Sequence, residues 1–398
     1  MNAPKSRAFE YIKLGDHDAH YFCLQQNPVS LARILNFALT KFRHQPKRRS
    51  QQLSLSVLVA RLRNAYRSLR RTLLLFYLFL SYKYKWRKLS PVLLLPAYGQ
   101  ICLPVHRGYK IFDLRRKVVI KVFDHDIDTS TVAAEVEQLN TVSQIEFAPS
   151  LRGCNIEERW YEEDYVPGTL HDSDKPLDTA ALLKHFRDAI LPKLHALVLF
   201  KKPTTTHALK YAYTLQKALS VSRLGQHEST VGEFAKIQAF VDSTIGHLGT
   251  DGNPQINLVF THGDFCPANM LTTRQGLKLI DWENAGYRSA LFDFYSYFFY
   301  RAACRNVAVS KIVFEINKAL PLFISTLSAR DARISTNLIH MEQVYRWIYY
   351  LEYICQDVER ERTDKQLNIL AFIRRYMEAF HCYDEMMAGH KSNNTQER

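Results

Sequence analysis

The sequence predicts an α+β protein in which a small β-rich region precedes a larger, mainly helical region. Short runs of β-branched and aromatic residues lie between residues 97 and 166. Apolar residues then recur at helical spacing over most of the remaining chain. Because strands and helices occupy successive parts of the chain, this order of elements favours an α+β fold.

The first 96 residues read as a basic extension of this body. Residues 1–100 hold 18 Lys and Arg against three Asp and Glu, so this segment accounts for the net charge of +14. Within 53–88, apolar positions such as Leu58, Leu62 and Leu69 are spaced by three and four residues, with arginines between them. This spacing predicts an amphipathic helix, which Pro91 ends.

The basic helix predicted over 53–88 has three interpretations. It packs on the body, or it lies on an anionic membrane surface through its apolar face and arginines, or it binds nucleic acid. Nucleic acid is the least favoured partner, since no known binding motif is present. The longest apolar run, Leu73 to Tyr82, is about half of the ~20 residues that a membrane-spanning helix needs.

The cysteine pattern indicates a reduced, intracellular protein. Seven cysteines are present, none of them in a CxxC pair, and this predicts neither a disulfide framework nor a zinc site. We therefore expect a cytoplasmic protein, either free or attached peripherally to the inner face of the membrane.

The β-rich region is expected to span residues 97–166. Two short runs, "YKIFDL" and "KVVIKVF", flank "RRK" and predict a hairpin. A helix follows over Ser130 to Val142, with Ser130 or Thr131 as its N-cap. The stretch "RWYEEDYVPG" then predicts a strand that ends at Pro167 and Gly168.

The helical region is expected to span residues 167–390, followed by a polar tail over 391–398. Its helices are interrupted by "INLVFTHGD", a strand running into a polar loop, and by "NMLTTRQGLKLIDWE", two strands joined by a turn. A strand–loop–strand–turn–strand path brings the start of the loop and the end of the hairpin together. Asp264, Asn269 and Asp281 can therefore converge, and their oxygens suit Mg²⁺.

A site for a metal and phosphates also needs a cation. Lys121 lies late in the apolar strand "VVIKV", where a lysine is costly to bury without a partner. Glu135, on the helix that follows, is the expected partner, with Glu137 as the second choice. Cys266, inside the loop, has no neighbouring base in the sequence and reads as an incidental residue.

The motifs H-G-D-F-C-P-A-N, at His262 to Asn269, and I-D-W-E, at Ile280 to Glu283, resemble those of the aminoglycoside phosphotransferase and choline kinase group. The resemblance extends to "VVIKVF", "AAEVEQL" and "YEEDYVPGTL", and covers roughly residues 97–390. It implies the bilobal protein-kinase-like fold, with a small β-rich N-lobe and a large helical C-lobe. It also implies a phosphotransferase that has an alcohol group as acceptor and uses ATP and Mg²⁺.

By this resemblance the polar loop carries the catalytic roles. Asp264 resembles the catalytic base, which takes the proton of the acceptor hydroxyl, and Asn269 and Asp281 resemble the metal ligands. His262 resembles the histidine that supports the loop from within. Asp293, in "LFDF", resembles an aspartate that stabilises the loop.

The same resemblance assigns the nucleotide to the β-rich lobe. Lys121 resembles the lysine that holds the α- and β-phosphates, with Glu135 as its ion-pair partner. The backbone from Asp164 to Val166 resembles the hinge that binds the adenine edge. One departure concerns the glycine-rich loop: "VHRGYK" offers the single Gly108, so the residues that cover the phosphates are unassigned.

The sequence specifies the acceptor less closely than it specifies the phosphoryl-transfer reaction. The loop sequences also resemble proteins of bacterial envelope-glycan biosynthesis, which implies a small molecule, a sugar or a lipid-linked glycan as acceptor. For a cationic acceptor, the acidic candidates in the C-lobe are Glu342, Glu352, Asp357, Glu359 and Glu361. The alternative is a catalytically inactive kinase-like binding protein associated with a membrane surface.

Overall fold

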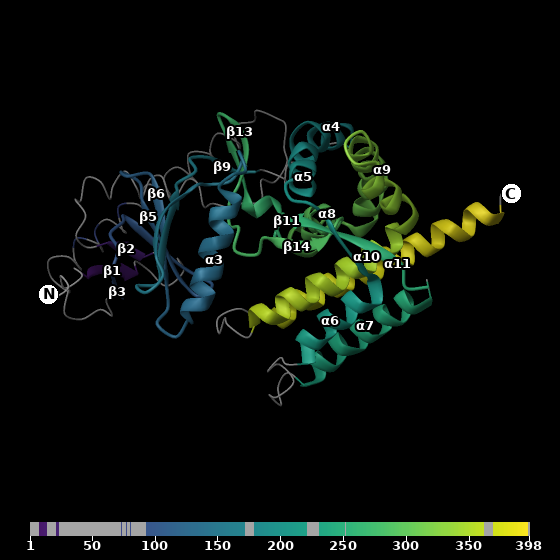
Figure 1. Cartoon of the computed structure of the whole chain (residues 1–398), viewed down its shortest axis with the longest axis horizontal. Coiled ribbons are helices and arrows are strands. Elements are labelled where there is room, and N and C mark those ends of the chain that lie inside the picture. Colours follow the sequence, from purple (N-terminus) through teal and green to yellow (C-terminus); the bar gives the residue numbers. More distant parts are fainter. Residues whose placement is uncertain are drawn as a thin grey trace, which may run out of the picture. The chain divides into compact units, whose positions relative to one another are not determined.

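The computed structural model describes residues 8–13, 21–23, 73, 77, 80, 93–171, 179–220, 231–250, 252–361 and 369–396. The chain divides into two compact units, residues 1–169 and residues 170–398, and each is described by itself (Figure 1). The helix predicted over 53–88 lies outside the described residues, except for Leu73, Tyr77 and Leu80. Among the described helices, none has both the length and the apolar character needed to cross a membrane.

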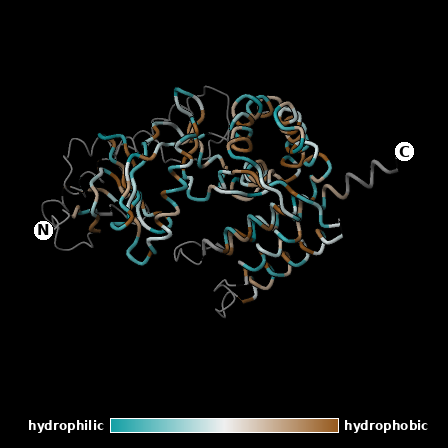
Figure 2. Tube along the Cα trace, in the orientation of Figure 1, coloured by the Kyte–Doolittle hydropathy of each residue, from teal (hydrophilic) through white to brown (hydrophobic). Residues whose placement is uncertain are grey.

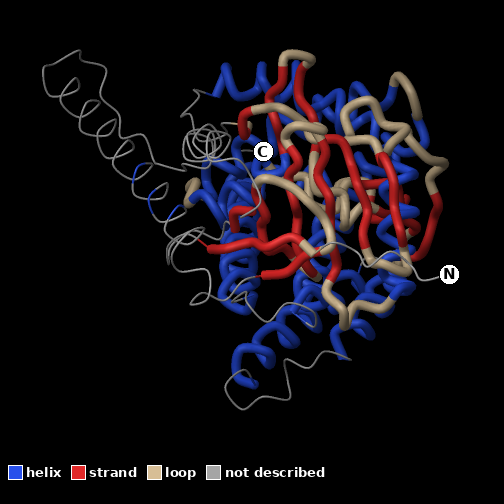
Figure 3. Tube along the Cα trace, turned by 90° about the vertical axis from the view of Figure 1, so that its left-hand side faces the viewer, coloured by secondary structure: helices blue, strands red, loops and turns tan. Residues whose placement is uncertain are grey.

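The first unit is built on one antiparallel sheet (Figure 3). Its strands are β1 (Phe9–Lys13), β2 (Tyr21–Cys23), β3 (Leu93–Leu95), β4 (Ile101–Val105), β5 (Gly108–Asp113), β6 (Val118–Phe123), β7 (Leu151–Asn155) and β8 (Trp160–Asp164). Among the described residues, these eight strands pair in the order β3-β1-β2-β4-β5-β6-β8-β7. The predicted hairpin is β5–β6, in which Lys110 pairs with Lys121 and Phe112 pairs with Val119.

The two faces of this sheet have different neighbours. One face carries an apolar core that includes Tyr11, Cys102, Ile111 and Ile120, all of them buried. On the other face lies Lys121, which contacts the helix α3 (Thr129–Val142) through Glu135. The alternation of strand side chains therefore separates a structural face from a face with buried charge.

The N-terminal strands are the main difference from the predicted domain boundaries. We expected the β-rich lobe to begin at residue 97, but β1, β2 and β3 lie before this residue and belong to its sheet. The Tyr11 hydroxyl donates to the Ala97 carbonyl at 2.9 Å and accepts the Gly99 N–H at 2.8 Å. Of the residues before 97 that the structure describes, those in β1, β2 and β3 are therefore part of the lobe.

Helix α3 begins earlier than expected. Its N-cap is Asp128, whose carboxylate accepts the backbone N–H of Ser130 at 3.3 Å. The predicted caps, Ser130 and Thr131, lie inside the helix. Asp is as good a cap as Ser, because a short side-chain oxygen reaches the free N–H groups of the first turn.

The second unit is mainly helical (Figure 1). Its helices are α4 (Thr179–His185), a π-helical turn (Phe186–Ile190), α5 (Leu191–Val198), α6 (Ala208–Ser220), α7 (Val231–Thr250), α8 (Phe292–Arg305), α9 (Val309–Ser328), α10 (Ala332–Glu361) and α11 (Ile369–Gln396). Helix α11 thus continues past residue 390, where we expected the polar tail to begin. Hydrophobic and hydrophilic residues are interleaved along these helices, as expected for helices with one buried side (Figure 2).

Two small sheets carry the polar loop. One has the order β10-β11-β14 and the other the order β13-β12-β9. Their strands are β9 (Thr169–Leu170), at the boundary of the units, β10 (Thr204–His207), β11 (Gln255–Thr261), β12 (Met270–Thr273), β13 (Gly276–Leu279) and β14 (Gly286–Ser289). Strand β11 and the hairpin β12–β13 are the strand and the two paired strands that the sequence predicts around the loop.

Aromatic side chains form much of the core of the second unit. Tyr350 stacks on Phe380 with ring centroids 4.1 Å apart, and Phe299 contacts Phe380 at 4.9 Å. These contacts join α8, α10 and α11. A buried ion pair between Arg301 and Glu315 joins α8 to α9. The aromatic-rich sequence after residue 291 therefore holds the helices against one another.

Candidate active site

The polar loop leaves strand β11 through a glycine that no other residue could easily replace. Gly263 has a left-handed backbone with φ of 80°. A Cβ atom at this position would lie 2.0 Å from the Asn284 carbonyl oxygen. Real Cβ atoms do not approach this closely, so the turn between His262 and Asp264 requires glycine.

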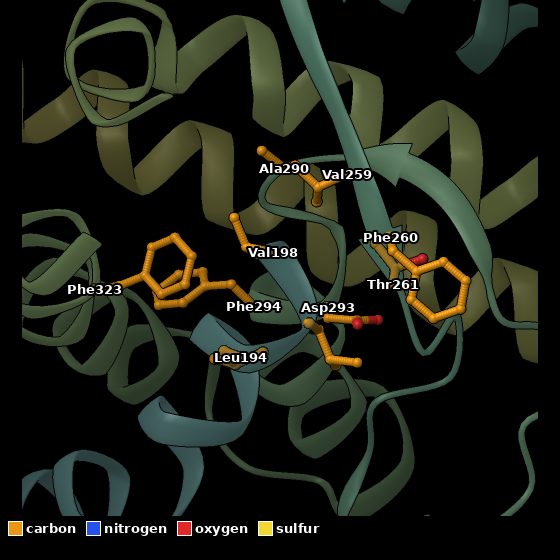
Figure 4. A pocket seen from close by; sticks show the side chains of 10 residues that line it. Leu194, Val198, Val259, Phe260, Thr261, Ala290, Asp293, Phe294 and Phe323 are labelled. Carbon is orange, nitrogen blue, oxygen red and sulfur yellow. The ribbon is translucent and has the colours of Figure 1, made fainter. Parts of the chain in front are cut away.

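Asp293 fixes the start of the loop from the first turn of α8. Its carboxylate accepts the backbone N–H of His262 at 2.6 Å and that of Gly263 at 3.0 Å. The carboxyl group is buried beside a small, mostly apolar cavity between α5, β11, α8 and α9, lined in part by Leu194 and Phe294 (Figure 4). Burial raises the pKa of Asp293 to about 7, against the lowering effect of the two N–H donors.

His262 joins the loop to the strand that precedes Asp281. Its side chain is fully buried, with Nδ1 3.2 Å from the backbone N of Asp264 and Nε2 3.1 Å from the carbonyl oxygen of Ile280. The Asp264 N–H donates to Nδ1, so Nε2 carries the proton and donates to Ile280. Burial lowers the pKa of His262 to about 4, although Asp264 and Asp281 oppose this change. The imidazole is therefore neutral and structural.

The two proposed metal ligands are brought together by the backbone. The Asn269 side-chain amide donates to the Asp264 carbonyl at 3.0 Å, which closes the loop. The Ile280 N–H donates to the Asn269 carbonyl at 3.0 Å, so Asp281 follows directly after a residue bonded to Asn269. Asp281 itself has a left-handed backbone with φ of 69°. This conformation is uncommon outside glycine and often marks functional sites.

The donor set of this loop fits a magnesium ion that is shared with phosphates. Over the described part of the chain, no three His, Cys, Asp or Glu side chains gather into a metal-binding cluster. Mg²⁺ does not need such a cluster, because one or two carboxylates with phosphate oxygens and water complete its shell. Asn269 and Asp281 supply one amide oxygen and one carboxylate.

Cys266 lies in the loop but is not suited to act as a nucleophile. Its side chain is buried, and burial together with the nearby Asp264 charge raises the pKa of the thiol well above its ordinary value. The thiol therefore stays protonated at neutral pH, whereas a nucleophilic cysteine needs a lowered pKa.

Two residues at the loop were not identified from the sequence. The Gln356 side-chain amide, on α10, donates to the Gly263 carbonyl at 2.8 Å. The Arg288 guanidinium, on β14, donates to the Thr261 hydroxyl at 3.1 Å and lies over the Phe292 ring at 4.9 Å. Gln356 is far from the motif in the chain, and no local pattern marks it.

The acidic candidates for the acceptor differ in their surroundings. The Glu352 carboxylate is buried and accepts the Ser289 N–H at 2.8 Å, the Ser289 hydroxyl at 2.5 Å and the Tyr211 hydroxyl at 2.8 Å. Glu342 accepts the hydroxyl of the buried Tyr295. Both carboxylates are therefore engaged in contacts within the protein and are poor candidates for holding a substrate.

Asp357 remains a candidate. It follows Gln356, which contacts the loop, and it is buried. The charges of both Asp357 and Asp264 act on the Cys304 thiol and on the Tyr353 hydroxyl. What keeps Asp357 as a candidate is its place in the chain, directly after the residue that contacts Gly263. The side chains of Glu359 and Glu361 lie outside the described residues.

In the first unit, the ion pair expected for Lys121 is present. The Lys121 ammonium is fully buried, and its Nζ lies 2.6 Å from Oε1 of Glu135. The Tyr161 hydroxyl, on the neighbouring strand β8, donates to the same oxygen at 3.0 Å. Glu137 is exposed on the other side of α3, so Glu135 is the partner. The part of this pair in nucleotide binding stays a prediction.

The stretch Asp164 to Val166, where we expect the hinge, is tied to two neighbouring segments by backbone hydrogen bonds. The N–H of Asp164 donates to the Ser150 carbonyl at 3.0 Å, and the N–H of Tyr165 donates to the Lys117 carbonyl at 2.9 Å. The Asp164 carboxylate pairs with Arg152. The part of this stretch in binding adenine stays a prediction.

The fold and the loop define the class of this protein. A β-rich unit with a buried Lys–Glu pair precedes a helical unit with an H-G-D-x-x-x-x-N loop and a following aspartate, which is the pattern of protein-kinase-like phosphotransferases. The chain matches the model of the choline/ethanolamine kinase family over residues 109–326, more than half of its length. It belongs to this family and is a kinase that has an alcohol group as acceptor.

Similar solved structures are remote. The choline kinase LicA from Streptococcus pneumoniae is 13% identical, with 70% of this chain and 90% of that chain covered and a TM-score of 0.44. A choline kinase from Cryptosporidium parvum is 13% identical, with 73% of this chain and 90% of that chain covered and a TM-score of 0.48.

An aminoglycoside phosphotransferase from Streptomyces rimosus, in complex with ADP and streptomycin, is 15% identical. The comparison covers 63% of this chain and 92% of that chain, with a TM-score of 0.40. Among curated proteins, no match to the chain was found. The assignment therefore rests on the family model together with the residues of the loop.

Proposed function

We propose that this kinase transfers the γ-phosphoryl group of ATP, with Mg²⁺, to a hydroxyl of a small molecule. The observation that supports this most directly is the geometry of the polar loop. Asp293 and His262 hold its backbone, and the Asn269–Ile280 bond places Asp281 beside it. Such a rigid framework is what phosphoryl transfer needs, because positioning and electrostatics supply most of its catalysis.

Asp264 is the proposed base. Its carboxylate stands on a loop whose backbone is fixed at His262, Gly263 and Asn269, so its position is set before the acceptor binds. It accepts the hydroxyl proton of the acceptor as the oxygen attacks phosphorus. Bound Mg²⁺ would neutralise charge on the phosphates, with Asn269 and Asp281 as its protein ligands.

The first unit would hold the nucleotide. The buried Lys121 ammonium is oriented by Glu135, which the Tyr161 hydroxyl orients in turn. A lysine fixed in this way can act as a point charge on phosphate oxygens. The Asp164 carbonyl and the Val166 N–H would bind the adenine edge.

The acceptor is proposed to be the hydroxyl of a sugar or a lipid-linked glycan, as the loop sequences imply. A second candidate is a cationic amino alcohol or amino sugar. It is favoured by the buried Asp357, which follows the loop-contacting Gln356 in the chain, and by the family, whose description names choline and ethanolamine. A buried carboxylate near the reacting hydroxyl would select such a cation.

Melting curves with ATP and Mg²⁺, alone and together, followed by an acceptor screen, test this proposal. We expect ATP with Mg²⁺ to raise the melting temperature, because a ligand that binds the native state stabilises it. With choline, ethanolamine, glucosamine or a lipid-linked glycan as the acceptor, the protein should then convert ATP to ADP. An unchanged melting temperature in every combination would contradict the proposal, and ADP release with none of these acceptors would argue for an inactive binding protein.

Peripheral attachment to an anionic membrane through residues 53–88 is a separate proposal. It is supported by the basic charge of this segment and its apolar positions at helical spacing. Binding to vesicles with phosphatidylserine should weaken with salt and disappear when residues 53–88 are deleted. Binding that survives both changes would exclude this segment as the attachment site.

A further inference from the structure

The hairpin β4–β5 carries basic side chains at the place where a glycine-rich loop is missing. We propose that Lys110 and Arg107 of this hairpin bind the nucleotide phosphates through their side chains. They would replace the backbone contacts that a glycine-rich loop supplies. This inference rests on ATP being the phosphoryl donor and names the residues that cover its phosphates.

The register of the sheet places Lys110 next to Lys121. The two residues are directly opposite one another on β5 and β6, so their side chains leave the same face of the sheet. Opposed residues of an antiparallel pair have Cβ atoms about 5 Å apart. Lys121 is fully buried and paired with Glu135, whereas Lys110 is half-buried. Two ammonium groups at opposed positions on one face of a sheet are suited to bind a polyanion such as a phosphate chain.

The tip of the hairpin has a fixed position. Arg107 has a left-handed backbone with φ of 64°, and its carbonyl accepts the Asp124 N–H at 2.9 Å. Gly108 follows, and a Cβ atom there would lie 2.1 Å from the Val122 carbonyl oxygen. The hairpin is thus held against the end of β6, and Arg107 lies at its tip. A non-glycine residue in this conformation often marks a functional site.

The same face of the sheet changes from apolar to basic along the strands. Phe112 and Val119 are an opposed pair, and the Phe112 ring contacts the Tyr165 ring edge-on at 6.4 Å, beside the hinge. The Lys110–Lys121 pair lies two residues away on each strand, on the side of the hairpin tip, about 7 Å from the Phe112–Val119 pair. An apolar end beside the hinge and a basic end toward the hairpin tip match the base and the phosphates of one nucleotide.

The test compares binding of ATP, ADP and adenosine by calorimetry, with and without Mg²⁺. The variants are Lys110→Met, Lys110→Arg and Arg107→Gln. Arg115→Gln is the control, since it removes one charge at the exposed turn at the other end of β5. We expect Lys110→Met to weaken ATP binding about tenfold, as for the loss of a charged hydrogen bond, and Arg107→Gln to weaken it as well. Lys110→Arg and the control should bind ATP like the wild type, and all should bind adenosine equally.

The outcomes separate this inference from the proposed function. Wild-type protein that binds no ATP would contradict the proposed function itself. Wild-type protein that binds ATP, with Lys110→Met binding it equally well, would overturn only the role of Lys110. Equal losses for ATP and adenosine in Lys110→Met would also overturn it, because they indicate a damaged fold.

Discussion

His262 shows how one side chain can set the geometry of a loop without taking part in the chemistry. Its imidazole accepts from Asp264 and donates to Ile280, so it ties the start of the loop to the strand before Asp281. Complete burial keeps it neutral, with a pKa of about 4. A charged imidazole would have no acceptor at Nδ1 for the Asp264 N–H, and the loop would lose this contact.

The stability of the protein should therefore depend on pH through His262. In the unfolded chain an ordinary histidine binds a proton below about pH 6.5, while in the folded protein His262 binds one only below about 4. Between these values the unfolded state holds more protons, so stability falls as the pH is lowered. We expect this group alone to remove about 3 kcal/mol over that range.

The measurement is the free energy of unfolding in urea between pH 7.5 and 4, for the wild type and for His262→Asn. The variant should be less stable at pH 7.5, and the difference should shrink as the pH is lowered. Asp293, with a raised pKa of about 7, changes stability in the opposite direction, but it is present in both proteins and cancels. A difference that stays constant with pH would contradict a neutral, buried His262.

At the residue scale, the sequence predicted which residues gather at the loop, including His262 and Asp293 that hold it, but it missed Gln356. The H-G-D and D-W-E motifs mark Asp264, Asn269 and Asp281 because these residues lie at fixed offsets within short segments. Glu135 could be paired with Lys121 because a single helix follows the strand. Gln356 could not be found, since only the packing of α10 against the loop brings it to Gly263.

At the scale of elements, the N-terminal strands carry the largest correction. Strands β1 and β2 have five and three residues, and runs this short give no reliable pattern of alternation. They are stabilised by distant partners, as β1 pairs with β3 and β2 with β4. The strands β5, β6, β12 and β13 were predicted because each pair is joined by a short turn.

Tyr11→Phe should test whether β1 is an integral strand of the lobe. The substitution removes a fully buried hydroxyl that bonds Ala97 and Gly99, and leaves two backbone groups without this partner. We expect a loss of about 1–2 kcal/mol in the free energy of unfolding.

The matched control for this strand is Tyr213→Phe, at a side chain that is 56% exposed on α6. It should change the free energy of unfolding by less than about 0.5 kcal/mol. Equal effects of the two substitutions would mean that the Tyr11 contacts contribute nothing to the free energy of unfolding.

At the scale of the whole molecule, the order of elements was sufficient to predict the fold class. A β-rich unit precedes a mainly helical unit, and the membership in the choline/ethanolamine kinase family agrees with this order. The acceptor could not be predicted in the same way. Its candidate carboxylates come from one long helix, and only the contacts of the folded chain show that Glu352 is already bonded to Ser289 and Tyr211.

The central claim is that Asp264 removes the proton of an acceptor hydroxyl during transfer from ATP. The most direct test is turnover by Asp264→Asn, measured with Mg²⁺ and the acceptor that the wild type uses, beside ATP binding by the same variant. We predict that turnover falls by about two to four orders of magnitude, as for loss of a general base, while ATP still raises the melting temperature. Wild-type turnover in Asp264→Asn would contradict the account.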